Sequence, residues 1–130
     1  MAHWCETYIG LPYSLGDSDC ARLVCRVRRE VFGGAVPDEA EAERAVSALG
    51  LVAQMQDGVA LYAEPTTTPQ EGDVVLMNCR GRPSHVGAYC LVNNEPHVLH
   101  AMKNAGQTVL HRLRDLPRFN LQVEGFYRWK

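Results

Sequence analysis

The chain has 130 residues, of which 46% are hydrophobic, and 13 Lys and Arg against 15 Asp and Glu give a formal net charge of −2. This size predicts one domain over residues 1–130, and the charge gives no reason to expect a nucleic-acid partner. Five cysteines, an odd number, favour reduced thiols over a disulfide framework. Residues 1–6 do not resemble a signal peptide, and no run of about 18 apolar residues occurs. We therefore expect synthesis in a cytoplasm without a signal peptide and no membrane insertion.

Helical signals dominate the first half of the chain. A helix is expected over residues 20–32, between the capping candidates at 17–19 and Gly33-Gly34, because apolar residues recur there at helical spacing (Cys20, Leu23, Val24, Val27 and Val31). Pro37, the acidic residues after it and Gly50 predict a second helix over 38–49. A weaker pattern favours a third helix over 52–62.

The pattern changes after a turn-rich segment at residues 64–72. Strands are expected at Asp73–Met77, His85–Val92, His97–Ala101, Thr108–Arg112 and Val123–Trp129, each bounded by Gly, Pro or Asn. Helices followed by strands predict an α+β domain, with N-terminal helices packed on an antiparallel sheet of about five strands.

Cys20 is a candidate nucleophile because it stands at the start of the first predicted helix. A helix N-terminus stabilises negative charge, so a thiolate is favoured there. The carboxylate of Asp19 opposes this effect, and a cationic partner is needed to secure the ion pair.

Candidate partners are the five histidines, His3, His85, His97, His100 and His111. His85 begins a predicted strand, and a short turn at Asn93-Asn94 would place it opposite Met102, with His100 one diagonal step away on the same face. His97 would then lie on the other face, and an odd-length turn would leave it too far along the strand. We expect Cys20 to attack a carbonyl carbon, His85 to act as its base and His100 to orient His85.

Five blocks of sequence, in a fixed order, carry a resemblance to a known family. They are Tyr8-Ile9-Gly10-Leu11-Pro12-Tyr13, Gly16 with Asp19-Cys20-Ala21-Arg22-Leu23-Val24, Glu71-Gly72-Asp73-Val74-Val75-Leu76-Met77, His85-Val86-Gly87-Ala88-Tyr89 and Val98-Leu99-His100-Ala101. Together they resemble the NlpC/P60 family of cysteine peptidases. Residues 27–33, Pro37 and residues 125–128 are closer to its phage-type branch.

The resemblance implies a papain-like α+β fold and hydrolysis of peptidoglycan stem peptides, typically between D-glutamate and the next, diamino residue. It implies a catalytic triad of Cys20, His85 and His100, with Tyr13 and Asp19 as substrate-binding residues. No cofactor or metal is implied. The phage-type branch further implies a place at the tail tip of a virion, with other tail-tip proteins as partners.

Four alternatives remain open at this stage. Tyr13 could only anchor a loop and Asp19 only cap the helix. Ala21-Arg22 and Gly16-Asp17 depart from the family pattern, and Arg22 either faces solvent or binds a stem-peptide carboxylate. A zinc site is disfavoured because the sequence has no C-x-x-C pair. A non-catalytic tail component with the same fold is the main rival to an enzyme.

Overall fold

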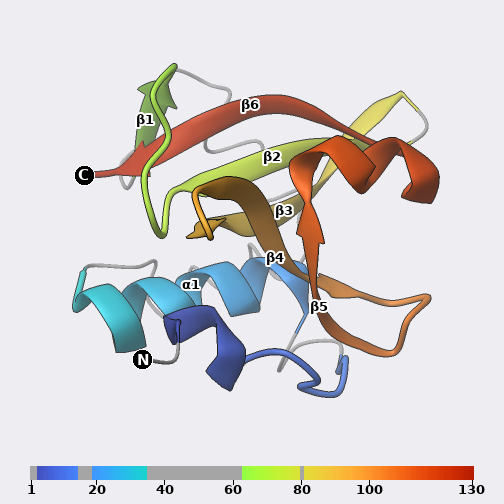
Figure 1. Cartoon of the computed structure of the whole chain (residues 1–130), viewed down its shortest axis with the longest axis horizontal. Helices are drawn as coiled ribbons and strands as arrows, with labels where there is room; N and C mark the ends of the chain where they lie inside the picture. Colours follow the sequence, from blue (N-terminus) through green and yellow to red (C-terminus); the bar gives the residue numbers. More distant parts are fainter. Residues whose placement is uncertain (1–2, 15–18, 35–62, 80) are drawn as a thin grey trace.

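The computed structural model describes residues 3–14, 19–34, 63–79 and 81–130. Within these ranges the elements are η1 (Trp4–Thr7), α1 (Cys20–Phe32), β1 (Ala63–Thr66), β2 (Val74–Cys79), β3 (Arg82–Val92), β4 (Glu95–Met102), β5 (Gln107–Arg112), η2 (Leu113–Phe119) and β6 (Leu121–Trp129). α1 and η1 lie together on one side of a curved antiparallel sheet (Figure 1). The α+β prediction is confirmed, with six strands in place of about five.

α1 has the bounds that the apolar periodicity predicts, 20–32. Asp19 is its N-cap, and Gly33 ends it in the left-handed conformation, with φ of 65°. The buried stripe of Leu23, Val24 and Val27 packs towards β3 and β4. The apolar face of the helix therefore fixes Cys20, its first residue, against the middle of the sheet.

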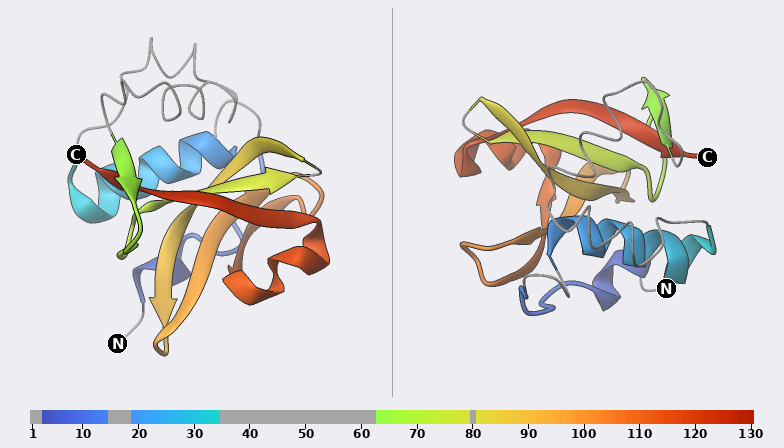
Figure 2. Two further views of the ribbon diagram at one scale, coloured as in Figure 1. Left: turned by 90° about the horizontal axis from the view of Figure 1, so that it is seen from above. Right: turned by 180° about the vertical axis from the view of Figure 1, so that it is seen from behind.

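The strands follow the order β1-β6-β2-β3-β4-β5, and all neighbours are antiparallel. The β3–β4 hairpin turns through Asn93 and Asn94, both with positive φ, which is the conformation of a two-residue type I′ turn. Its register pairs Cys90 with His97 and Ala88 with Leu99, as an even-length turn requires. Figure 2 shows that β4 and β5 bend towards the N-terminal end of α1.

Two hydrophobic cores form on opposite faces of the sheet because side chains alternate along each strand. The larger core lies between α1 and the sheet and includes Val86, Ala88 and Leu99. The smaller core lies on the other face, where η2 inserts Leu116 against Val75 and Val98. Both faces of the sheet are therefore covered at residues 86–90 of β3 and 98–101 of β4, which are buried.

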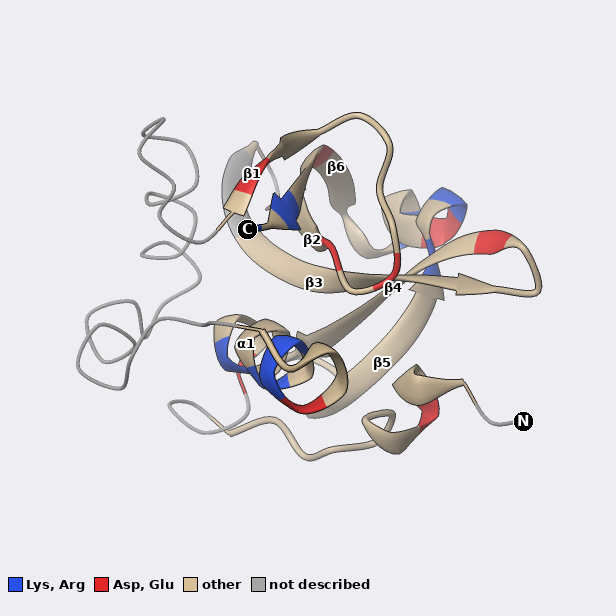
Figure 3. Ribbon diagram, turned by 90° about the vertical axis from the view of Figure 1, so that its left-hand side faces the viewer, with Lys and Arg blue, Asp and Glu red and all other residues tan. Residues whose placement is uncertain are grey.

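Charges of both signs intermix on the described surface. Figure 3 shows basic residues along α1 and around η2, with acidic residues beside them. Ion pairs join Arg26 to Glu30 at 3.0 Å and Arg112 to Asp115 at 2.7 Å. No helix among the described residues is long and apolar enough to cross a membrane.

One strand departs from the prediction. Residues 64–72 were expected to be turn, yet β1 occupies Ala63–Thr66 and pairs with the C-terminal end of β6. β1 is a short edge strand containing Pro65, which an edge position tolerates because one side of the strand needs no hydrogen-bond donor. The helices expected over 38–49 and 52–62 lie outside the described residues.

Candidate active site

Cys20 is the first residue of α1 and is buried, with 8% of its surface exposed. Asp19 Oδ1 accepts a hydrogen bond of 3.0 Å from the backbone N–H of Arg22, which fixes the first turn of the helix. The N–H groups of Cys20 and Ala21 face the sulfur and lower the pKa of the thiol. Both are among the donors at a helix start that have no partner within the helix.

The backbone N–H of Val86, the residue directly after His85, also faces the sulfur and lowers the pKa of the thiol. β3 pairs with β4 only from Ala88 to Val92, so this stretch of β3 lies beyond the paired part of the hairpin. The backbone of Val86, the chain neighbour of His85, therefore lies beside the Cys20 sulfur. No hydrogen bond between Sγ and the His85 imidazole is present among the described residues.

Burial controls the protonation of this pair. It raises the pKa of the Cys20 thiol to about 11, with a further increase from the charge of Asp19, and it lowers the pKa of His85 to about 4. The N–H donors around the sulfur act in the opposite direction but do not outweigh burial. Burial therefore opposes the thiolate expected from the helix N-terminus and favours a thiol and a neutral imidazole.

His85 and His100 are joined as predicted. His85 Nε2 lies 2.8 Å from Nδ1 of His100, and their rings meet edge to face. Extending the β3–β4 register by three residues places Met102 opposite His85, so His100 is the diagonal neighbour. Because Nε2 of His85 is engaged, Nδ1 is the ring nitrogen that this contact leaves available.

A third histidine extends this pair; the sequence analysis named it as a candidate partner but gave it no place in the site. His100 Nε2 lies 3.0 Å from Nδ1 of His111 on β5. His100 has no exposed surface, and burial together with the neighbouring imidazoles of His85 and His111 lowers its pKa. The signal was present in the strand pattern, because His100 pairs with Val109 and His111 is the diagonal neighbour across β4 and β5. Placing His111 beside His100 from the sequence would have required predicting the register of the β4–β5 hairpin as well.

Tyr13 packs against the larger core, which includes Cys20. Its N–H donates to the carbonyl of Gly106 at 2.9 Å, and Pro12 forms a β-bridge with Gln107, so the β4–β5 hairpin holds this loop. Burial raises the pKa of the Tyr13 hydroxyl, and the negative charges of Cys20 and Asp19 raise it further. Tyr13 therefore keeps its hydroxyl proton and also anchors this loop to the β4–β5 hairpin.

Asp19 is buried, and its capping role is established by the bond to the Arg22 amide. The Arg22 guanidinium also approaches it, with Nε 3.8 Å from Oδ2. Arg22 therefore leans towards the helix start instead of facing only solvent. Binding of a substrate amine by Asp19 remains a prediction.

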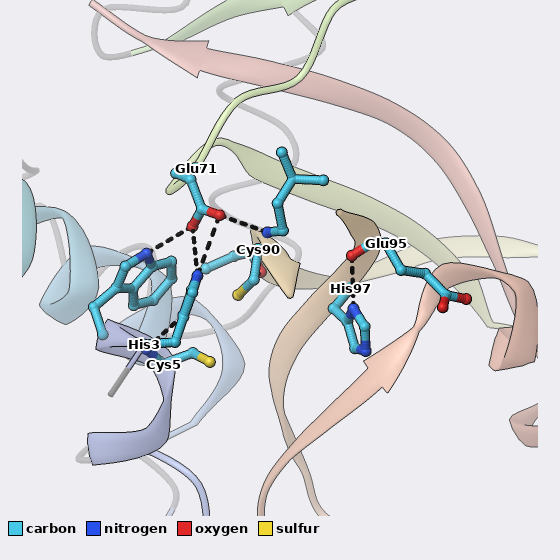
Figure 4. A network of polar contacts seen from close by, with 9 residues as sticks. His3, Cys5, Glu71, Cys90, Glu95 and His97 are labelled. Carbon is cyan, nitrogen blue, oxygen red and sulfur yellow. Dashed lines mark hydrogen bonds and ion pairs between the residues drawn. The ribbon is translucent and has the colours of Figure 1, made fainter. Parts of the chain in front are cut away.

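His97 was expected to lie on the other face of its strand, away from His85. It lies on β4 opposite Cys90, and its Nδ1 contacts the backbone carbonyl of Glu95 at 2.8 Å. Figure 4 shows it apart from a separate network around Glu71, whose carboxylate accepts from His3 and Trp4. Neither His3 nor His97 belongs to the His85–His100–His111 chain. Among the described residues, no group of three or more potential ligands is arranged to hold a metal ion.

The sequence profile of the NlpC/P60 family matches residues 10–115, which include every residue of this site. The chain therefore belongs to the NlpC/P60 family, whose members are generally cysteine peptidases that hydrolyse peptidoglycan. No match was found among curated proteins or among solved structures.

Proposed function

We propose that this protein is a peptidoglycan endopeptidase that uses Cys20, His85 and His100 as its catalytic triad. The observation that carries the proposal is the pairing of two contacts. The amide that follows His85 faces the Cys20 sulfur, and His85 contacts His100 at 2.8 Å. A nucleophile, a base and a group that orients the base therefore follow one another in space.

The resting protonation states define the first step. The Cys20 proton passes to Nδ1 of His85 as the sulfur attacks the carbonyl carbon of a stem-peptide bond. The N–H groups of Cys20 and Ala21 stabilise the oxyanion of the tetrahedral intermediate. His85 then returns its proton to the leaving amine, which leaves a thioester on Cys20. Water attacks the thioester, gives a proton to His85, and the sulfur departs and is reprotonated.

Substrate recognition is assigned to the residues around the sulfur. The Tyr13 hydroxyl is positioned to donate to the substrate backbone, and the Asp19 carboxylate is suited to a stem-peptide amine. We infer cleavage between D-glutamate and the diamino residue, since this is the bond that the family resemblance indicates. Tyr13→Phe is expected to raise KM more than it lowers kcat if the hydroxyl contributes equally to substrate and transition-state binding.

Digestion of purified peptidoglycan tests this activity. Wild-type protein is expected to release fragments with a new amino group on the diamino residue, identified by mass spectrometry, whereas Cys20→Ala and His100→Ala are expected to release few or none. His97→Ala is the matched control because it lies on the same strand as His100 but outside the chain of histidines. Equal digestion by wild type and Cys20→Ala would exclude the proposal.

The resemblance to the phage-type branch supports a place at the tail tip of a virion, where local cleavage of peptidoglycan would help the tail cross the cell wall. The proposed partners are stem peptides and other tail-tip proteins. Antibodies against the chain are expected to label the tail tip of purified virions in electron micrographs, and label confined to other parts of the particle, or absent, would contradict this assignment.

A second candidate, a non-catalytic tail component, is favoured by one observation. The Cys20 thiol is buried and its pKa is raised to about 11, as in a cysteine that only packs. This role predicts virions whose tails are intact and infective with Cys20→Ala, and purified protein that leaves every chemotype of peptidoglycan uncut.

A further inference from the structure

The chain of imidazoles extends past the proposed triad. His85, His100 and His111 lie on three successive strands, β3, β4 and β5, with contacts of 2.8 Å and 3.0 Å between ring nitrogens. Both nitrogens of His100 are engaged, and its side chain is inaccessible to water. The two neighbouring histidines therefore determine the orientation of His100, and solvent does not contribute.

We propose that His111 is a positioning residue that fixes the tautomer of His100, and through it the tautomer of His85, so that His85 presents an unprotonated Nδ1 to Cys20. This inference rests on the proposed function. It assigns to the reaction a residue outside the triad.

The number of protons on each ring links the directions of the hydrogen bonds between the three histidines. A neutral imidazole carries one N–H, so each contact between two rings has one donor and one acceptor. If Nδ1 of His111 accepts from Nε2–H of His100, then Nδ1 of His100 must accept from Nε2–H of His85, which leaves Nδ1 of His85 as a base. If His111 instead donates from Nδ1, every bond reverses and His85 carries its proton on the nitrogen needed by Cys20.

The surroundings of His111 hold it as a neutral ring in a fixed plane, which the accepting direction requires. Its ring stacks on Phe119 with centroids 4.0 Å apart and an angle of 11° between the planes, which fixes the ring plane. Burial lowers its pKa despite the attraction of Asp115 on η2, so the ring is neutral and keeps one nitrogen as an acceptor. η2 therefore supplies both the ring that stacks on His111 and the carboxylate that opposes the lowering of its pKa.

Long-range ¹H–¹⁵N NMR spectra of the imidazoles test the proposal directly, because they report which ring nitrogen carries the proton. In the wild type we expect His85, His100 and His111 all to be protonated at Nε2. His111→Phe keeps an aromatic ring for Phe119 but removes the acceptor, and it is expected to give mixed tautomers at His100 and His85. His111→Gln retains an acceptor in its side-chain carbonyl and is expected to restore the Nε2–H form.

Kinetics provide a second measurement on the same variants. Loss of one neutral hydrogen bond corresponds to about a tenfold fall in kcat for His111→Phe, with KM changed by less than about twofold and recovery in His111→Gln. Protonation of His100 at Nδ1 in the wild type, or tautomers unchanged in His111→Phe, would overturn the proposal. The wild-type spectrum decides the direction even if a variant does not fold. The spectra also need no turnover, so they separate this inference from the peptidase activity.

Discussion

A Cβ atom added to Gly87 would lie 3.0 Å from Cβ of His100 and 2.8 Å from the carbonyl oxygen of Leu99. β3 and β4 approach each other so closely here that only a glycine fits between them. Gly87 is two residues from His85, so this close approach also sets the distance between the two histidines.

Gly87→Ala is therefore expected to push β4 away from β3 and weaken the His85–His100 contact. We predict a loss of peptidase activity of about tenfold or more and a lower melting temperature, measured by peptidoglycan digestion and circular dichroism. Gly125→Ala on β6 is the matched control, since its nearest contact would be an ordinary 3.7 Å to Tyr127. Equal behaviour of the two variants would mean that the spacing at Gly87 is not limiting.

Stability is expected to fall in mild acid. Burial lowers the pKa of His85 from 6.5 to about 4, and that of His100 is lowered as well. Between these pH values the unfolded chain binds protons that the folded chain does not, so the free energy of unfolding decreases as pH falls through this window. His85 alone accounts for about 3 kcal/mol. Urea denaturation at pH 7 and pH 4.5 measures the effect, and a shallower dependence is expected in His100→Gln. A stability that does not change between the two pH values would show that these imidazoles are not buried in neutral form.

Alkylation of the thiol tests its resting protonation. Because the pKa of Cys20 is raised to about 11, its rate of reaction with iodoacetamide is expected to increase with pH up to and beyond pH 9, without a plateau in acid. Peptide mass spectrometry resolves Cys20 from the other cysteines. A plateau near pH 6 would instead reveal a stable thiolate–imidazolium pair.

Glu71 joins the N-terminal segment to the sheet. Its carboxylate accepts hydrogen bonds from Trp4 Nε1 at 2.7 Å and from the N–H of Leu91 at 2.6 Å, and it contacts His3 at 3.2 Å (Figure 4). Glu71→Ala leaves these donors without their partner and is expected to lower the free energy of unfolding by about 2 kcal/mol. Tryptophan fluorescence in urea measures this change. The exposed Glu6 provides the control, with an expected change for Glu6→Ala below about 0.5 kcal/mol. Equal losses in the two variants would contradict a specific role for the Glu71 carboxylate.

The features that local sequence determines were predictable. α1 was predicted with its bounds because the apolar spacing, Asp19 and Gly33 all lie within one segment. The His85–His100 contact was predicted because an even-length turn fixes the register of a hairpin. Both predictions required only residues that are close in the sequence.

The features that depend on distant packing were not predictable in the same way. The role of His111 requires the β4–β5 register and the position of η2, and β1 forms only because the end of β6 is available to pair with it. The resting thiol at Cys20 depends on how deeply α1 is buried by the sheet, a property that the helix alone does not encode.

The sheet order places the three histidines on strands of different stability. β3 has neighbours on both sides, whereas β5, which carries His111, is an outermost strand. Outer strands open at lower free energies than central ones during native-state fluctuations. β5 should thus separate from β4, and His111 from His100, while the hydrophobic cores stay intact. Turnover would then cease at a urea concentration below the one that unfolds the molecule.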